Sequence, residues 1–223
     1  MECFGDVSGH FRGLIQHDCD VVVVGVVFGD SIAASRCPKK IVRKVDDIKE
    51  AKWHDLTEVQ KRRIIECLSD NDVLTFGYSK FTAEMLHALE CHYLLHQNVE
   101  FPTAWDLALT GYAYGEILFE YGAQDEQRVI FYPDRVASVS QAEEMVDHTA
   151  DFADLTQVSI SASHNKGGIQ AADCFAGAIA EDYKNGTSWL DEFDDDDVIE
   201  TTAAAIAQLE ADLVQFDKRQ ARR

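Results

Sequence analysis

Basic residues are scarce in this chain. Its 223 residues include 40 Asp and Glu but only 20 Lys and Arg, which gives a formal net charge of -20 at pH 7. A surface this rich in carboxylates is typical of proteins from salt-loving organisms, because a Debye length of about 3 Å at molar salt suppresses repulsion between like charges. We therefore expect a halophilic source. The same screening means that the negative charge does not exclude a nucleic-acid partner.

Long apolar runs and metal-binding signatures are also missing. No run of about 18 apolar residues exists for a membrane span, and the start MECFGDVSGH has no apolar signal-peptide core. We therefore expect a cytoplasmic protein with no membrane partner. The six cysteines lack CxxC spacing, so reduced, mostly buried thiols are favoured over a zinc ribbon. His92 and His96 share a predicted helix face without an HExxH pattern, so ordinary histidines are favoured over a metal site.

Length and composition indicate one elaborated domain. A chain of 223 residues with an apolar fraction of 46% can bury one sizeable core. We predict a main domain over residues 1–186 and an acidic linker over residues 187–197, which contains the run DEFDDDD. An amphipathic, Ala-rich C-terminal helix is predicted over residues 198–223.

Strands are predicted from β-branched and alternating runs. Val21–Phe28 is nearly all apolar, which indicates a strand that is covered on both faces and central in its sheet. Glu2–Val7 predicts a shorter strand with Asp6 near its end, and the two strands are expected to form an antiparallel hairpin. Further strands are predicted over Val73–Tyr78, Val129–Tyr132 and Val158–Ser163.

The clearest helix is GGIQAADCFAGAIAEDY, Gly167–Tyr183, whose apolar residues recur at helical spacing. Its Ala and Gly residues would let another backbone approach, and we expect the strand that carries Asp6 to pack there. Asp173 falls within or beside the buried face, where a carboxylate needs a cation, a donor or a metal, unless it only grazes the surface. Other helices are predicted over Glu58–Leu68, Phe81–Gln97, Ala104–Tyr121 and Gln141–Phe152.

The segment KEAKWHDL places a carboxylate beside an ammonium group. If Glu50, Lys52 and His54 lie on a strand, alternation projects all three from one face. Many metal-dependent nucleases place a metal ligand next to a charge stabiliser in this way. A routine ion pair on a solvated edge strand is the alternative interpretation.

Four motifs together resemble the large prokaryotic domain-of-unknown-function family 3800. They are FGDVSG near the start, EAK at Glu50–Lys52, YPDR around Asp134 and SHNKGGIQAADCFAGAI. The last motif is the most specific, and the resemblance spans about residues 2–183. It implies a ribonuclease H-like α/β fold with a mixed central sheet flanked by helices, to which the predicted C-terminal helix would be added.

The resemblance also implies a set of site residues: an acidic cluster of Asp6, Glu50, Asp134 and Asp173, with Lys52 and His164 beside it. Two positions depart from the family pattern. Val7 stands where the family usually has Glu, and His164-Asn165 matches its Ser-Lys element only approximately.

Such a cluster suits phosphodiester hydrolysis. The reaction needs a nucleophilic water and a neutralised leaving oxygen, and two Mg²⁺ or Mn²⁺ ions about 3.5–4 Å apart supply both. These hard ions bind converging carboxylates. The hypothesis is therefore a Mg²⁺- or Mn²⁺-dependent nuclease that acts on DNA or RNA. The four acids would be the metal ligands, and Lys52 or His164 would aid the water or the developing charge.

Two alternatives stay open. The missing acid at Val7 and the sparse basic surface favour a non-catalytic ribonuclease H-like scaffold or regulatory binding protein. Glu50-Ala51-Lys52 could instead belong to a restriction-type nuclease fold with Asp30 as the preceding acid. In that case the helix at Gly167–Tyr183 has no explanation.

Overall fold

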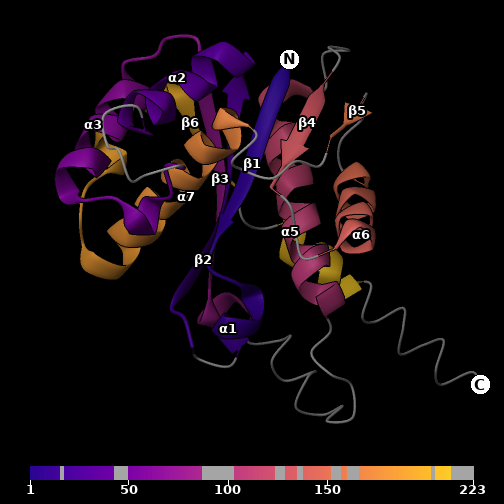
Figure 1. Cartoon of the computed structure of the whole chain (residues 1–223). Helices are drawn as coiled ribbons and strands as arrows, with labels where there is room; N and C mark the ends of the chain where they lie inside the picture. The colour runs from indigo at the N-terminus through magenta and orange to yellow at the C-terminus, as the bar shows by residue number, and fades with distance from the viewer. Residues whose placement is uncertain are drawn as a thin grey trace, which may run out of the picture.

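The computed structural model describes residues 1–15, 18–42, 50–86, 103–123, 129–134, 138–151, 157–159, 166–201 and 204–211. Within them, a six-stranded sheet in the order β5-β4-β1-β2-β3-β6 lies between two layers of helices (Figure 1). The strands are β1 (Glu2–Ser8), β2 (Val21–Gly29), β3 (Thr75–Thr82), β4 (Ile130–Pro133), β5 (Gln157–Val158) and β6 (Val198–Thr201). The predicted mixed sheet flanked by helices is confirmed.

The sheet is built around β1 and β2. These strands form the predicted antiparallel hairpin, and β3 continues the antiparallel pairing on the other side of β2. Three further pairs, β1 with β4, β4 with β5 and β3 with β6, are parallel. Residues Val21–Phe28 of β2 are all buried, which confirms the prediction of a central strand covered on both faces.

Each face of the sheet has its own helices and its own apolar core. One face is covered by α7 (Gly167–Asn185), with α2 (Ser31–Val42) and α3 (Glu58–Ser69) packed beside it. The other face is covered by α5 (Thr103–Leu118), with α6 (Val139–Ala150) packed against α5. Figure 1 shows the two layers to the left and right of the sheet.

Short elements complete the described structure. The helix α1 (Phe11–Ile15) lies in the connection between β1 and β2. The short 3-10 helices are η1 (Trp53–Asp55), η2 (Ala83–Leu86), η5 (Leu190–Glu192) and η6 (Asp195–Asp197), and η3 (Phe119–Ala123) is a π-helical turn that follows α5. No helix in the described ranges is both long and apolar enough to cross a membrane.

The ends of the helices follow from local chemistry. The Thr57 backbone N–H donates to the Gln60 side chain at 2.8 Å, as in a capping box, so α3 begins where the sequence predicts. Asp30 accepts hydrogen bonds from the backbone N–H groups of Ile32 and Ala33 at the start of α2. The helix α7 ends at Gly186, whose φ of 64° is the left-handed conformation that glycine adopts without strain.

The C-terminal region differs from its prediction. The prediction that a helix begins at Val198 is wrong. Residues 198–201 form β6, which pairs with β3, and the chain is helical at 204–211. The β-branched side chains of Val198 and Ile199 favour pairing with an available strand edge. Residues 187–197 also pack on the body, since Trp189 and Phe193 are buried in the core beneath α7.

Other differences concern element boundaries. β3 extends to Thr82, which pairs with Val21, so residues 81 and 82 belong to a strand and not to the predicted helix. The hydrogen-bond ladder to β2 outweighs the helical spacing of the apolar residues here. Residues 87–102, which contain His92 and His96, lie outside the described residues, and so does most of the predicted strand after Val158.

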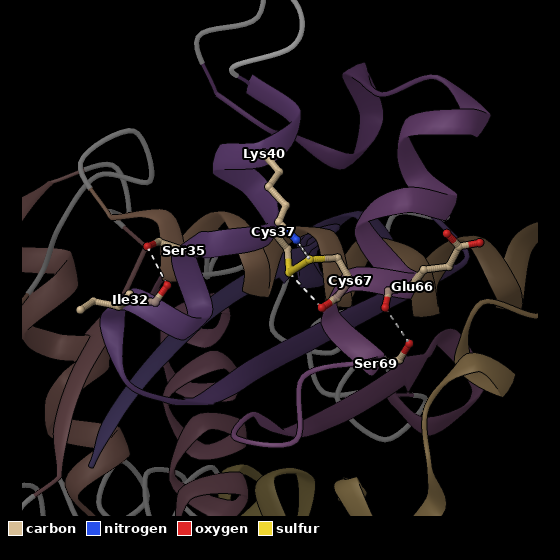
Figure 2. Close-up of a disulfide and its surroundings, with 7 residues drawn as sticks. All are labelled: Ile32, Ser35, Cys37, Lys40, Glu66, Cys67 and Ser69. Atoms are coloured by element: carbon tan, nitrogen blue, oxygen red, sulfur yellow. Dashed lines mark hydrogen bonds between the residues drawn. A yellow bond between two sulfur atoms is a disulfide. The ribbon is translucent and has the colours of Figure 1, made fainter.

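Cys37 of α2 and Cys67 of α3 form a disulfide, so the expectation of reduced thiols is wrong for this pair (Figure 2). The two cysteines are 30 residues apart in the sequence, and packing of α2 on α3 brings their Cα atoms to 5.7 Å. Sequence spacing alone does not reveal such a pairing. Cys3 and Cys174 are free and buried, as expected.

We predict that Cys37→Ser lowers the free energy of unfolding by about 3 kcal/mol, because opening a loop of this size restores entropy to the unfolded chain. Urea denaturation with and without a reductant measures the effect. The reductant should destabilise the wild type by a similar amount and leave Cys37→Ser unchanged. Equal stability of the oxidised wild type and the variant would contradict the prediction.

Candidate functional site

Strand register places two aspartates side by side. In β1 the Phe4 side chain packs into the core beneath α7, so Asp6, two residues later, points to the same face. In β4 the Tyr132 side chain belongs to that core as well, and Asp134 follows it by two residues. The Asp134 backbone N–H donates to the Gly5 carbonyl at 2.8 Å. The two carboxylates therefore extend from neighbouring parallel strands toward α7.

The helix α7 brings a third aspartate to this face. Gly25 of β2 is the strand partner of Asp6, and a Cβ atom at Gly25 would lie only 2.9 Å from the Cβ of Ala176. A side chain at Gly168 would likewise collide with an aromatic ring of β1. Small residues on both elements thus let the helix lie close to the sheet, and Asp173 enters the electrostatic environment of Asp6.

The three carboxylates disfavour one another's charge. Burial raises the pKa of Asp6 well above its ordinary value, and the negative charges of Asp173 and Asp134 raise it further. A hydrogen bond of 2.8 Å from the Val7 backbone N–H opposes this shift only in part. Burial also raises the pKa of Asp173. A proton or a cation is therefore needed to relieve this group at neutral pH.

The segment that follows Glu50 is fixed on α7 by backbone hydrogen bonds. The buried Ala51 N–H donates to the Gln170 side chain at 3.1 Å. The Trp53 N–H donates to the carboxylate of Asp173 at 2.9 Å, which lowers the pKa of that acid. No strand forms here, so the conditional prediction of an alternating strand at residues 50–54 is wrong.

The Trp53 ring also fixes residues 51–53 on α7. The Trp53 ring lies so close to Gly177 that a Cβ atom would collide with it. The ring nitrogen of Trp53 donates to Glu181 at 2.7 Å, and the Lys61 ammonium donates to the same carboxylate at 2.6 Å. A face of α7 with contacts at residues 170, 173, 177 and 181 therefore positions residues 51–53.

Lys52 provides positive charge beside the aspartates. Its ammonium lies 3.3 Å from Glu50, and the two side chains are 39% and 19% exposed. Partial burial lowers the pKa of Lys52, but the hydrogen bond to Glu50 and the charges of Glu50, Asp173 and Asp134 outweigh it and raise the pKa overall. Lys52 is therefore a positive charge that contacts Glu50 and interacts electrostatically with Asp173 and Asp134.

Two further residues were placed differently from the sequence hypotheses. His54 is largely exposed and pairs with Asp55 at 3.3 Å, yet its charge also lowers the pKa of Asp173. The pattern of the KEAKWHDL segment already singled out His54, but the family resemblance did not include it among the site residues. Asp30 uses its carboxylate to cap α2, so nothing links it to Lys52 as the restriction-type hypothesis requires.

The departures from the family pattern have different outcomes. His164 lies outside the described residues. Val7 packs against the core beneath α5, on the face of the sheet opposite Asp6. A carboxylate at position 7 would point away from Asp134 and Asp173, so Val7 does not deprive the aspartate group of a member.

The aspartate group fits a hard divalent cation in the chemistry of its donors. Asp6, Asp134 and Asp173 offer only oxygen ligands, which Mg²⁺ and Mn²⁺ prefer, and their mutual repulsion is what a cation relieves. In the part of the chain that the structure describes, no three His, Cys, Asp or Glu side chains already converge as a metal site. Binding would therefore need the side chains to adjust.

Comparison with known proteins places the fold. No family model and no curated protein sequence matches this chain. Among solved structures, it is similar to a chain of the PCNA:RNase HII complex from Archaeoglobus fulgidus, with a TM-score of 0.50 and 16% identity. The match covers 82% of this chain and 73% of the other. The fold is ribonuclease H-like. At this identity the ribonuclease H-like neighbour establishes the architecture and no activity.

We predict that Asp6→Asn stabilises the metal-free protein at neutral pH. Folding raises the pKa of Asp6, so the site favours folding most below the unfolded pKa near 3.9, and this contribution is lost as the pH rises toward the folded pKa. Asn keeps the acceptor for the Val7 N–H but never becomes charged. The gain should be largest near pH 7 and should shrink toward pH 4.

Urea denaturation in EDTA at several pH values measures this difference. The exposed Asp191→Asn serves as the matched control, because it removes the same charge outside the site. A gain that is independent of pH, or an equal gain in the control, would contradict the predicted cause.

We predict that Gln170→Leu lowers the free energy of unfolding by about 1–3 kcal/mol, because it leaves the buried Ala51 N–H without its acceptor. At pH 4, where a buried carboxyl group is neutral, Gln170→Glu keeps an acceptor at this position and should retain more of the stability. Thermal unfolding followed by circular dichroism compares the two variants. If both lose the same stability, the hydrogen bond to Ala51 is not the cause.

Proposed function

We propose that this protein is a metal-dependent nuclease that hydrolyses phosphodiester bonds of DNA or RNA. The observation that carries the proposal is that Asp6, Asp134 and Asp173, from three separate elements, lie on one face of the sheet and interact electrostatically. Buried like charges oppose folding, so a group assembled in this way calls for a role outside stability.

In this proposal the three aspartates hold Mg²⁺ or Mn²⁺, and Glu50 completes the ligand set from beside Lys52. The bound ion would supply a nucleophilic water and neutralise the leaving oxygen. Lys52, protonated and partly exposed, would bind a phosphate oxygen and stabilise negative charge that develops on it. The backbone N–H of Trp53 orients the Asp173 carboxylate and favours its charged form, which offsets part of the effect of burial.

Two further observations support the proposal. The ribonuclease H-like fold is shared with a chain of the PCNA:RNase HII complex from Archaeoglobus fulgidus. The motifs that resemble domain-of-unknown-function family 3800 supply Asp6, Asp134 and Asp173, and membership of that family stays a prediction. The non-catalytic scaffold hypothesis has lost part of its support, since Val7 faces away from the aspartates.

We predict that the protein cleaves labelled DNA or RNA in Mn²⁺ or Mg²⁺ at high salt, and that Asp173→Asn lowers the rate at least about 100-fold through loss of a ligand. Lys52→Ala should lower the rate by about 10- to 100-fold while metal binding is retained. Gel-based cleavage assays with DNA, RNA and hybrid substrates measure the rates, and calorimetry measures Mn²⁺ binding.

Asp191→Asn again serves as the control, because an exposed acid outside the site should leave the rate unchanged. Absence of both cleavage and saturable Mn²⁺ binding in the folded wild type would reject the nuclease and favour the scaffold hypothesis. Cleavage that persists in Asp173→Asn would reject the assignment of this site.

A further inference from the structure

The helices α2 and α3 carry positive charge that the rest of the chain lacks. Between them they hold six Lys and Arg residues and only two Glu residues, in a chain whose acids outnumber its basic residues 40 to 20. Cations gathered on one pair of helices repel one another unless an anion lies between them. The distribution of charge therefore points to a negatively charged ligand at this surface.

A hollow lies where the two helices meet. It has a volume of about 380 Å³ and is lined by Arg36 and Lys40 of α2 and by Arg63 of α3. Its size is at the lower end of small-molecule sites, which span roughly 300–1,000 Å³. All three cationic side chains are exposed, and none forms an ion pair with an acid within the described residues. Three positive charges thus face a space that can admit a ligand.

The disulfide sets the spacing of these cations. Cys37 directly follows Arg36 and lies one turn before Lys40, while Cys67 lies one turn after Arg63. The Lys40 ammonium reaches the sulfur of Cys67 at 3.6 Å, and Figure 2 shows its side chain extending over the disulfide. The covalent link therefore holds cations of two helices around one hollow, which reduces the entropy lost on binding an anion.

The hollow also contains acidic side chains, and part of its positive charge has another explanation. Glu66 and Asp70 also line it, but the Glu66 carboxylate points away from Lys40 in Figure 2. Basic residues near a helix C-terminus can simply complement the helix dipole, which accounts for Lys40 in the last turn of α2. Arg36 and Arg63 lie in the middle of their helices, so the dipole does not account for them.

We propose that this hollow binds a phosphate group, held by Arg36, Lys40 and Arg63. A guanidinium group can form two parallel hydrogen bonds to the oxygens of one phosphate, whereas an ammonium group acts as a point charge. The two arginines therefore favour phosphate over a simple anion such as chloride. The phosphate could belong to a nucleic-acid strand or to a free phosphorylated small molecule. The first source rests on the proposed nuclease function. It is consistent with α2 and α3 covering the same side of the sheet as the aspartates.

The first arm of the test uses inorganic phosphate alone. It is titrated into the full chain in EDTA at constant ionic strength, followed by calorimetry and by amide chemical shifts. We expect saturable binding that weakens roughly tenfold or more in Arg63→Gln and partly recovers in Arg63→Lys. Lys184→Gln, an exposed cation on α7, is the matched control and should bind as the wild type does. Absence of saturable binding, or an equal loss in the control, overturns the proposal.

The second arm uses a labelled single-stranded oligonucleotide and distinguishes the two sources. If a backbone phosphate occupies the hollow, Arg63→Gln should reduce the slope of log affinity against log salt by about 0.7. An unchanged slope, with phosphate binding still lost, assigns the hollow to a free phosphorylated ligand. Asp173→Asn should bind phosphate as the wild type does. The phosphate titration therefore tests the hollow independently of whether the protein cleaves nucleic acid.

Discussion

The close packing of α7 on β1 and β2 is the contact on which the candidate site depends. Gly25 and Ala176 meet at the crossing, and a side chain at Gly25 would collide with Ala176 and push the helix from the sheet. Because interiors are densely packed, such a shift would carry the whole helix with it. Asp173 lies on that helix beside Asp6, so the same small residues that stabilise the core also determine how close the carboxylates come.

The site opposes the stability of the fold that contains it. Burial and mutual repulsion raise the pKa values of Asp6 and Asp173, and the structure offsets this only in part, through single backbone N–H donors and Lys52. Specific contacts nevertheless hold the site in place, since Gln170 and the Trp53 ring fix the backbone around Lys52. Unfavourable charge maintained by specific contacts is characteristic of functional sites.

Charge is distributed unevenly over the molecule. The chain as a whole carries a net charge of -20, whereas α2 and α3 form a basic region joined by the disulfide of Cys37 and Cys67. Both the basic region and the aspartates belong to the layer that contains α7. In the two proposals made above, a ligand with several phosphates would contact this layer twice. The basic residues of α2 and α3 would pair directly with one phosphate, and a metal ion held by the aspartates would contact another.

Local sequence patterns are enough to predict the central strand at Val21–Phe28, the helix that begins at Gly167 and the acids at the ends of β1 and β4, because apolar periodicity and motif spacing are local properties. Three features depend on the folded chain: Val198 pairs as a strand, Cys37 meets Cys67, and residues 51–53 lie along α7 without forming a strand. Each of these outcomes depends on a partner distant in the chain: an available strand edge, a neighbouring helix, or hydrogen-bonding side chains on α7. Local patterns carry no information about such partners.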